Sequence, residues 1–238
     1  MARTALITGG GRRIGQAIAL SLAEKGYSIA LHYRQSESSA KACLGRIEAM
    51  GGECTLFQAD FSIEKDLTGL MDHVFARFPE CSLLVNNASL FERTSFLESE
   101  YDLFNRLFAV NVKAPFFLSR DFARRCHQGQ IINVIDTKIT QNPVDYFVYV
   151  LTKKSLYDFT RLAAKSLGPD IRVNAVCPGL ILPPSGQEDK NAFERMGRRI
   201  PLRRTGSVED VLKAIRFLLE SPFVTGECVF VDGGENLL

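Results

Sequence analysis

The sequence of 238 residues contains no tryptophan, only three histidines and no CxxC pair among its six cysteines. Metal sites built from cysteine and histidine need such residues at short, regular spacings. His32, His73 and His127 are dispersed along the chain, as are the cysteines, so we expect no metal site. Scattered cysteines are typical of free thiols in a reducing compartment, which predicts a cytoplasmic protein.

Long apolar runs and blocks of like charge are also missing. No run reaches the roughly 18–20 residues that a membrane-spanning helix needs, and no signal-peptide core precedes the strand-like segment Thr4–Thr8. The 29 basic and 27 acidic residues nearly balance, at a net charge of +2. The sequence therefore predicts neither a membrane nor a nucleic-acid partner.

Short β-rich runs do alternate with amphipathic segments along the whole chain. Apolar residues recur at helical spacing between Ile63 and Phe78, and Ser207-Val-Glu-Asp210 has the pattern of a capping box that opens a last helix. We predict seven strands, at Thr4–Thr8, Ser28–Tyr33, Cys54–Gln58, Ser82–Asn86, Gln130–Val134, Arg172–Val176 and Glu227–Val231.

Apolar strands separated by helices indicate a parallel sheet that is covered on both faces. Right-handed crossovers then give a single Rossmann-type, doubly wound α/β domain over residues 1–238, which binds ligands beyond the carboxyl ends of its strands. No linker or internal repeat divides the chain. The irregular stretch Cys177–Lys190, rich in proline and glycine, is either a lid over the ligand or a passive surface loop.

A glycine-rich turn follows the first strand. The segment Thr8-Gly-Gly-Gly-Arg-Arg-Ile-Gly15 leads into a helical pattern that runs from Ile14 to about Lys25, and Gly26 is expected to cap that helix. Glycines at such a turn let the backbone approach a pyrophosphate, which the free N–H groups of the helix attract. This placement predicts a dinucleotide site.

The end of the second strand indicates which dinucleotide binds. An NAD enzyme places an acid there for the ribose 2′-hydroxyl, but this chain has no acid before Glu37. Arg34 could instead pair with a 2′-phosphate, Ser36 could donate to it, and Arg12 or Arg13 could add charge. A solvated surface arginine is the alternative for Arg34. The missing acid favours NADP(H).

A phenol and an ammonium stand four residues apart at Tyr149 and Lys153, on one face of a predicted helix. Reduction consumes a proton, and a tyrosine with a pKa of about 10 is ready to donate one at neutral pH. A nearby lysine and an oxidised nicotinamide would together stabilise the tyrosinate that remains. A Tyr-x-x-x-Lys pattern is common by chance, so its context decides.

That context resembles the short-chain dehydrogenase/reductase family along the whole chain, in Thr8–Gly15, Asp60, Asn86-Asn87-Ala88, Asn111, Tyr149 with Lys153, Pro178-Gly179 and Val231–Gly234. The resemblance implies that Asp60 contacts the adenine and that Asn87 lies along the cofactor. Asn111 would help to relay protons to Lys153, which would also hold the nicotinamide ribose. It also implies cofactor contacts at Gly9, Ile14, Gly15, Tyr33, Phe61, Ala88, Pro178 and Gly179.

The chain departs from that family at two positions. Arg13 replaces the usual second glycine of the first turn, and Asp136 stands where the catalytic serine is expected. A loss of activity is one explanation. The charge of Asp136 suggests another, because a carboxylate opposes the negative charge that develops on a carbonyl oxygen but stabilises an iminium-like cation. A hydrogen-bonded aspartate could also steer a water or a proton to nitrogen.

The same departures resemble the pteridine reductases and the bacterial dihydromonapterin reductases. The matching segments are Gly11–Gly15, His32-Tyr33 with Ser36, Asn87–Phe91, Asp136, Tyr146 with Tyr149 and Lys153, and Pro178–Leu180. The resemblance implies NADPH-dependent reduction of dihydropterins to tetrahydropterins, with dihydrofolate as a further candidate substrate. It implies a homotetramer as well, whose interface the apolar Leu237-Leu238 tail would help to bury.

This resemblance also implies a set of substrate contacts. Phe91 would stack on the flat pterin, and Ser89 would hydrogen-bond both the pterin and the cofactor. Arg13 would reach the cofactor phosphates and the pterin edge, while Tyr146 and Leu180 would line the pocket. On spacing alone Phe91 is also compatible with a core aromatic.

Two other functions stay open. One is a carbonyl reductase of the 3-oxoacyl type, against which the missing serine argues. The other is a catalytically silent NADP(H)-binding regulator, which would have no need to keep Asn111, Tyr149 and Lys153 together.

Overall fold

Seven parallel strands form one sheet in the order β3-β2-β1-β4-β5-β6-β7. The computed structural model describes residues 3–183 and 190–238. The strands lie within two residues of their predicted ends, at β1 (Thr4–Ile7), β2 (Ser28–Tyr33), β3 (Cys54–Gln58), β4 (Cys81–Asn86), β5 (Gly129–Val134), β6 (Ile171–Pro178) and β7 (Cys228–Val231). The predicted parallel sheet is confirmed.

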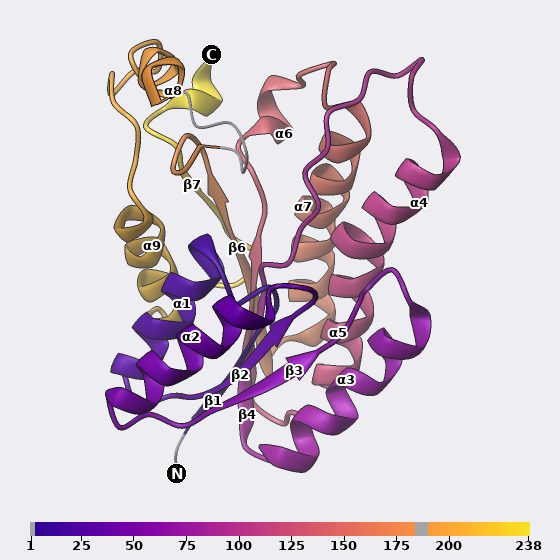
Figure 1. Ribbon diagram of the computed structural model, residues 1–238, viewed down its shortest axis with the longest axis vertical. Coiled ribbons are helices and arrows are strands. Elements are labelled where there is room, and N and C mark those ends of the chain that lie inside the picture. The colour runs from indigo at the N-terminus through magenta and orange to yellow at the C-terminus, as the bar shows by residue number, and fades with distance from the viewer. Residues whose placement is uncertain (1–2, 184–189) are drawn as a thin grey trace.

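Helices cover both faces of this sheet (Figure 1). One face is covered by α1 (Arg13–Glu24), α2 (Glu37–Ala49) and α9 (Val208–Glu220). The other is covered by α3 (Glu64–Arg77), α5 (Ala114–Ala123) and α7 (Phe147–Leu167), with α4 (Tyr101–Phe108) packed against α7. A π-helical turn, η1 (Ala109–Lys113), joins α4 to α5. The short elements α6 (Lys138–Gln141), α8 (Lys190–Gly197) and η2 (Glu235–Leu237) complete the described secondary structure.

The strands fold this way because their side chains are buried on both sides of the sheet. All residues of β1 and β2 are buried, as a parallel sheet between two helical layers requires. Ile18 of α1 and Ile215 of α9 belong to one core, whereas Leu70 of α3 and Phe122 of α5 belong to the core on the opposite face. Burial of these apolar side chains is the main favourable contribution to folding.

The strand order reverses beside β1, which pairs with β2 on one side and β4 on the other. The chain leaves β1 toward α1 on one face of the sheet, and it leaves β4 toward the helices on the other face. Such a switch point opens a crevice beyond the carboxyl ends of the strands, where doubly wound proteins bind their ligands.

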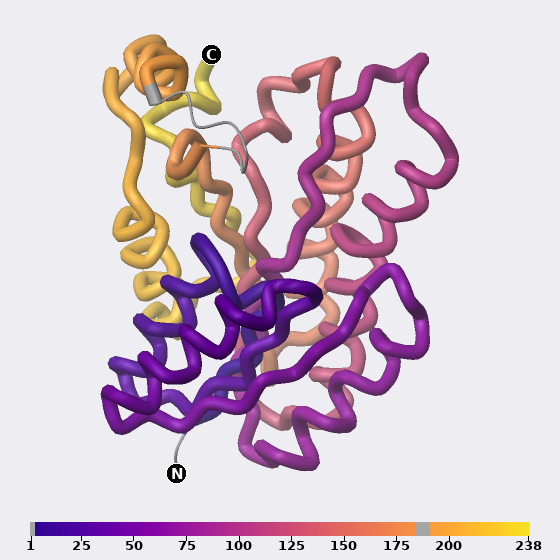
Figure 2. The backbone as a smooth tube through the Cα atoms, in the orientation of Figure 1, coloured from indigo at the N-terminus to yellow at the C-terminus, as the bar shows by residue number. Residues whose placement is uncertain are grey.

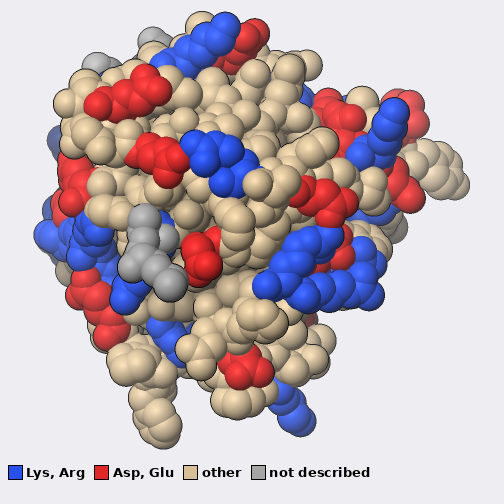
Figure 3. All heavy atoms as spheres, turned by 90° about the horizontal axis from the view of Figure 1, so that it is seen from below, with Lys and Arg blue, Asp and Glu red and all other residues tan. Residues whose placement is uncertain are grey.

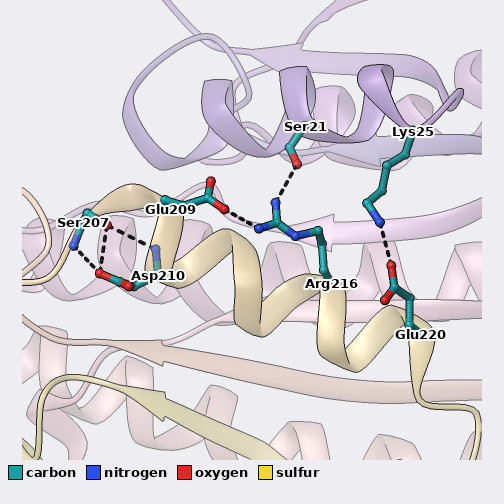
Figure 4. Close-up of polar contacts among 7 residues, drawn as sticks. All are labelled: Ser21, Lys25, Ser207, Glu209, Asp210, Arg216 and Glu220. Carbon is teal, nitrogen blue, oxygen red and sulfur yellow. Dashed lines mark hydrogen bonds and ion pairs between the residues drawn. The ribbon is translucent and has the colours of Figure 1, made fainter.

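Helix α9 is fixed at its start and along its side (Figure 4). The predicted capping box is present, because the Ser207 hydroxyl accepts from the Asp210 backbone N–H and the Asp210 carboxylate accepts from that of Ser207. Lys25, the residue after α1, pairs with Glu220 at 2.6 Å. Exposed pairs of this kind contribute about 0–1 kcal/mol, so burial of the apolar face of α9 contributes most to its docking.

The molecular surface mixes charges of both signs. Seen from below relative to Figure 1, lysine and arginine alternate with aspartate and glutamate (Figure 3). None of the described helices has the length and apolar character needed to cross a membrane. All six cysteines are free thiols. Within residues 3–183 and 190–238, no three His, Cys, Asp or Glu side chains gather as metal ligands.

Candidate active site

A cavity of about 740 Å³ opens beyond the carboxyl ends of the central strands, a size typical of small-molecule sites. It brings together most of the predicted site residues, which are distant in sequence. Those in its wall are Gly9, Arg12, Arg13, Ile14, Gly15, Tyr33, Arg34, Ser36, Phe61, Asn87, Ala88, Ser89, Phe91, Asp136, Tyr146, Tyr149, Lys153, Pro178, Gly179 and Leu180. Asp60 and Asn111 are not among the wall residues.

The glycine turn between β1 and α1 has the backbone shape that the sequence predicts. Gly9 has φ +64°, in the region that favours glycine. A Cβ atom on Gly15 would lie 2.3 Å from the Gly9 carbonyl oxygen, so only glycine fits there. The Asn87 amide donates to the Thr8 and Gly9 carbonyl oxygens at 2.9 and 3.2 Å. These contacts tie the turn to the end of β4 and leave room for a phosphate at the start of α1.

Arg13, which replaces a family glycine, keeps a left-handed backbone with φ +55°. That conformation costs a non-glycine residue roughly 1–2 kcal/mol. Its guanidinium donates to the Pro183 carbonyl oxygen at 2.7 Å, so it links the glycine turn to the segment after β6. Burial and the neighbouring Arg12 lower the pKa of Arg13, which indicates that a negative group is favoured beside these two arginines.

The end of β2 offers donors rather than an acid. Arg34 is exposed at the cavity wall, and its guanidinium contacts the Gln35 side chain at 3.2 Å. The Ser36 hydroxyl lies beside the glycine turn, near Gly11. The acids in the described wall, Glu92 and Asp136, belong to the connections after β4 and β5. The strand end is therefore suited to a phosphate.

His32 has a structural role that the sequence interpretation missed. It is buried, its Nδ1 accepts from the Gly9 backbone N–H at 3.0 Å, and its Nε2 faces the Ala59 carbonyl oxygen at 3.0 Å. Its ring stacks on Phe61 with centroids 4.2 Å apart. Burial lowers the pKa of His32 to about 4, so the neutral imidazole bridges the glycine turn and the end of β3. A histidine inside an apolar strand was the available signal.

Tyr149 and Lys153 lie one turn apart on α7, and both are buried. The Tyr149 hydroxyl donates to the Asp136 carboxylate at 2.7 Å. The Lys138 backbone N–H donates to the other Asp136 oxygen at 2.8 Å, which fixes the carboxylate on both sides. The Lys153 ammonium donates to the Val134 carbonyl oxygen at 3.0 Å. The end of β5 therefore holds both the acid and the lysine in place.

That Lys153 stabilises the tyrosinate stays a prediction, and the structure adds two effects on the pKa of the phenol. Burial raises the pKa of Tyr149 well above 10, and the charge and hydrogen bond of Asp136 raise it further. Burial lowers the pKa of Lys153 to about 8, although Asp136 opposes that change. Burial disfavours the charged tyrosinate, and the facing carboxylate disfavours it further. Tyr149 therefore holds its proton firmly.

Asn111 lies in the π-helical turn η1 and is buried. Its side-chain NH₂ donates to the Leu90 carbonyl oxygen at 2.9 Å and to the Thr152 hydroxyl at 3.0 Å, and its oxygen accepts from the Leu90 N–H at 2.8 Å. The side chain thus ties the connection after β4 to α7. Its role in relaying protons to Lys153 stays a prediction.

Asp60 follows β3 and orders the turn there. Its carboxylate accepts from the backbone N–H and the hydroxyl of Ser62 at 2.9 and 2.7 Å. Burial would raise the pKa of Asp60, but these hydrogen bonds and nearby positive charge lower it overall. Contact with the adenine stays a prediction, because Asp60 is not in the cavity wall.

The connection from β4 to α4, residues 87–100, carries Phe91 into the cavity, and the sequence interpretation did not mark it as a long irregular segment. It rises alongside α7 (Figure 2). Thr94 pairs with the chain before α7, since its N–H donates to Asp145 and its carbonyl accepts from Phe147. Phe91 then stacks on Tyr146 at 4.6 Å and is 39% exposed. It is therefore not a core aromatic.

The stretch Cys177–Lys190 is irregular only in part. Strand β6 continues to Pro178, and Leu180 and Ile181 are buried. Residues 184–189 lie outside the described part of the chain, so the choice between a lid and a passive loop stays open. Phe193 and Met196 of α8 also line the cavity, and the sequence interpretation had not assigned them to the site.

Comparisons with known proteins agree with this geometry. A family model described as enoyl-(acyl carrier protein) reductase matches residues 10–236. Pteridine reductase 1 of Leishmania tarentolae is 32% identical, over 99% of this chain and 97% of the relative. A 3-oxoacyl-[acyl-carrier-protein] reductase of Synechocystis sp. is also 32% identical, over 98% and 96%.

Two solved structures match the whole fold. FolM alternative dihydrofolate reductase 1 of Brucella canis, complexed with NADP, has a TM-score of 0.91 and 34% identity, over 100% of this chain and 95% of that one. The protein of the same name from Brucella suis, also in complex with NADP, has a TM-score of 0.93 and 36% identity, over 99% and 95%.

The chain belongs to the short-chain dehydrogenase/reductase family. The family, the fold and the oxidoreductase class predicted from the sequence are confirmed. Identity alone does not choose a substrate for this short-chain dehydrogenase/reductase, because a pterin reductase and an oxoacyl reductase match it equally well.

The buried Lys153 should make stability depend on pH. Its pKa is about 8 in the folded protein and about 10.4 when unfolded, so above pH 8 the unfolded state binds more protons. The free energy of unfolding of the wild type, relative to Lys153→Met, should therefore rise by roughly 1.5 kcal/mol between pH 8 and 9.5. Urea unfolding at each pH measures this.

Lys165→Met, at an exposed position near the end of the same helix, is the matched control and should show a difference from wild type that does not change with pH. A pH-independent difference for Lys153→Met as well would show that burial does not lower the pKa of Lys153.

Proposed function

We propose that this NADP(H)-dependent oxidoreductase reduces the C=N bond of a dihydropterin, such as dihydromonapterin or dihydrobiopterin, to give a tetrahydropterin, with dihydrofolate as a further substrate. The observation that carries the proposal is the 2.7 Å hydrogen bond from Tyr149 to Asp136. It places a carboxylate beside the proton donor, where the family has a serine.

The residues of the cavity wall are suited to bind NADP(H). Gly9 and Gly15 line the cavity at a turn with no room for side chains, and Arg12, Arg34 and Ser36 offer donors for a 2′-phosphate. When bound, NADPH supplies a hydride to the carbon of the C=N bond. The NADP in both Brucella structures is consistent with this assignment. Asn87, Ala88, Pro178 and Gly179 would line the bound cofactor.

The charge of Asp136 selects the bond that is reduced. Hydrogenation of a C=N bond passes through or towards an iminium-like cation, which a neighbouring carboxylate stabilises. Hydrogenation of a carbonyl builds negative charge on oxygen, which the same carboxylate opposes. In a cavity that excludes water these opposing effects are larger than in solution. Asp136 therefore favours the imine.

Proton delivery follows from the same pair. The raised pKa of Tyr149 keeps the phenol protonated at neutral pH, so that it is available as a proton donor. Asp136, held by the Lys138 N–H and by Tyr149, can steer a water or a proton toward that nitrogen. Lys153 is cationic below its pKa of about 8 and offsets the negative charge left on the phenol.

The substrate would lie against Phe91. One face of that ring is stacked on Tyr146, and its edge meets Tyr149 at 4.7 Å. The partly exposed ring offers a flat apolar surface to a pterin. Ser89 would hydrogen-bond the pterin and the cofactor, Arg13 would reach the phosphates and the pterin edge, and Leu180 would close the wall.

The two alternatives are less compatible with the site. Carbonyl reduction of the 3-oxoacyl type would place developing negative charge beside Asp136. A silent NADP(H)-binding regulator would have no use for a buried Tyr149 and Lys153 aligned on one helix. The similarity to 3-oxoacyl reductases keeps the first alternative as the comparison in the test.

Assembly and location complete the proposal. A homotetramer is supported by exposed apolar side chains along α4, α5 and α7, at Tyr101, Phe104, Phe116, Leu151 and Leu162. A cytoplasmic location is supported by six free cysteines.

An assay of NADPH oxidation tests the proposal directly. The purified protein should turn over dihydromonapterin or dihydrobiopterin and show little activity with acetoacetyl-CoA or a plain aldehyde, because Asp136 opposes charge on a carbonyl oxygen. Turnover of only the ketoester or the aldehyde would show a carbonyl reductase. NADPH binding without turnover of any substrate would show a silent protein.

Asp136→Ser should lose pterin reduction by about 100-fold or more in kcat, the range for removal of one preorganised electrostatic group, while its NADPH affinity stays within about twofold. Steady-state kinetics and NADPH fluorescence measure the two effects. Asp158→Ser, an exposed aspartate on α7, is the control. Unchanged pterin kinetics in Asp136→Ser would refute the role of the carboxylate.

Arg34→Glu should weaken NADPH binding by about tenfold or more and change NADH binding little, because a charge-assisted hydrogen bond of about 1.5–3 kcal/mol to the 2′-phosphate is lost. Titrations of both nucleotides measure this. Arg46→Glu, an exposed arginine of α2 outside the cavity wall, should leave both affinities unchanged. Equal weakening of the two nucleotides would mean that Arg34 does not contact the phosphate.

A further inference from the structure

A lysine that the sequence interpretation did not select lies in the cavity wall beside the reacting groups. Lys138 opens α6, and its backbone N–H holds the Asp136 carboxylate at 2.8 Å. Its ammonium lies 6.0 Å from the centre of the Phe91 ring. Lys138 is thus the cation nearest in sequence to the catalytic acid, and its side chain reaches the aromatic surface proposed for the pterin.

The Lys138 ammonium has no protein acceptor among the residues that the structure describes. The two acids of the described wall are already engaged, Asp136 with Tyr149 and Glu92 with Arg106 at 3.1 Å. An ammonium carries three donors and no acceptor, so it leaves hydrogen-bonding capacity directed at the cavity. A ligand with oxygen acceptors would use that capacity.

A structural role is the rival explanation. The buried Glu235 carboxyl has an oxygen without a hydrogen-bond partner among the described residues. Burial raises the pKa of Glu235 and Lys138 opposes that change, so Lys138 could serve only as a distant counter-charge. If Lys138 has only this structural role, its replacement should lower stability and the turnover of all substrates alike. If Lys138 recognises the substrate, the loss should depend on which side chain the substrate carries.

The position of Lys138 indicates which part of a substrate it meets. In the proposed function the C=N bond lies beside Asp136 and Tyr149, and the pterin ring is stacked on Phe91. Lys138 contacts Asp136 through its backbone N–H, and its ammonium lies 6.0 Å from the Phe91 ring centre, so it would meet the substituent on the reacting ring carbon. The carboxylates of a folate are separated from its ring by a p-aminobenzoyl group and lie farther out. The hydroxyl groups of a short side chain would lie close to the ring, where the Lys138 ammonium could donate to them.

We propose that Lys138 is a specificity-determining residue that donates hydrogen bonds to the hydroxyl oxygens on the side chain of a dihydropterin. Hydroxylated dihydropterins, rather than dihydrofolate, are then the preferred substrates. This inference rests on the proposed function, because it assigns a substituent only if a pterin ring occupies the cavity. A site built to bond a substrate hydroxyl discriminates against an analogue that lacks it.

Steady-state kinetics of wild type and Lys138→Met test this with dihydrobiopterin, which carries a hydroxylated side chain, 6-methyl-7,8-dihydropterin, which has none, and dihydrofolate. In Lys138→Met, kcat/KM for dihydrobiopterin should fall about tenfold or more, as expected for the loss of a hydrogen bond to a charged donor. The values for 6-methyl-7,8-dihydropterin and dihydrofolate should change less than about twofold. Lys138→Arg should recover much of the dihydrobiopterin activity.

Lys213→Met, an exposed lysine of α9 outside the cavity wall, is the matched control, and NADPH binding verifies that each variant is folded. Equal losses for all three substrates would overturn the inference in favour of the structural role. A loss confined to dihydrofolate would overturn it in favour of carboxylate recognition. If wild type turns over the pterins and Lys138→Met matches it, only this inference is wrong; if wild type turns over none, the proposed function is wrong and the inference with it.

Discussion

The hydrogen bond between the Tyr149 phenol and the Asp136 carboxylate sets the chemistry that the rest of the site can support. A tyrosine that faces a serine can share its proton with a neutral group, but a tyrosine that faces a carboxylate cannot lose its proton without placing two negative charges side by side. Lys153 lies 5.7 Å from the phenol ring and offsets only part of that cost. The pair therefore disfavours further negative charge beside it, which is the basis of the proposed reduction of a C=N bond.

The fold maintains this pair from both sides. Asp136 follows β5, whose Val134 carbonyl also anchors Lys153, and Tyr149 belongs to α7, which Asn111 ties to the connection after β4 through Thr152. The same connection bears Phe91. The proton donor, the acid and the aromatic surface consequently share one hydrogen-bonded frame, and a shift of α7 would move all three. This arrangement explains why Asn111 is buried in a π-helical turn, a feature frequent at functional sites.

The sheet could be predicted from sequence because its signals are local. Largely apolar runs, such as Ser28–Tyr33, are favoured in the interior of a parallel sheet, and the capping box at Ser207 needs only residues three apart. The glycine turn was recognisable for the same reason. The role of His32 was missed because its partners Gly9 and Ala59 lie in the connections that follow other strands. The stacking of Phe91 on Tyr146 could not be predicted either, because it depends on the pairing of Thr94 with the chain before α7.

Electrostatics could be predicted in part only, because burial is not a property of sequence. The spacing of Tyr149 and Lys153 indicated a tyrosinate that a lysine could stabilise, but it could not show that burial and Asp136 raise the pKa of the tyrosine. Arg13 shows the same limit: its identity suggested an added charge, whereas its left-handed backbone and its bond to Pro183 show that it also connects the glycine turn to the segment after β6. A non-glycine residue with a positive φ has a strained backbone, which glycine would not have at the same position. The strain must be offset by contacts of the side chain that a glycine could not make. Relatives that share the fold and are equally similar in sequence to this chain can therefore differ in substrate because of a few charged residues around the cavity.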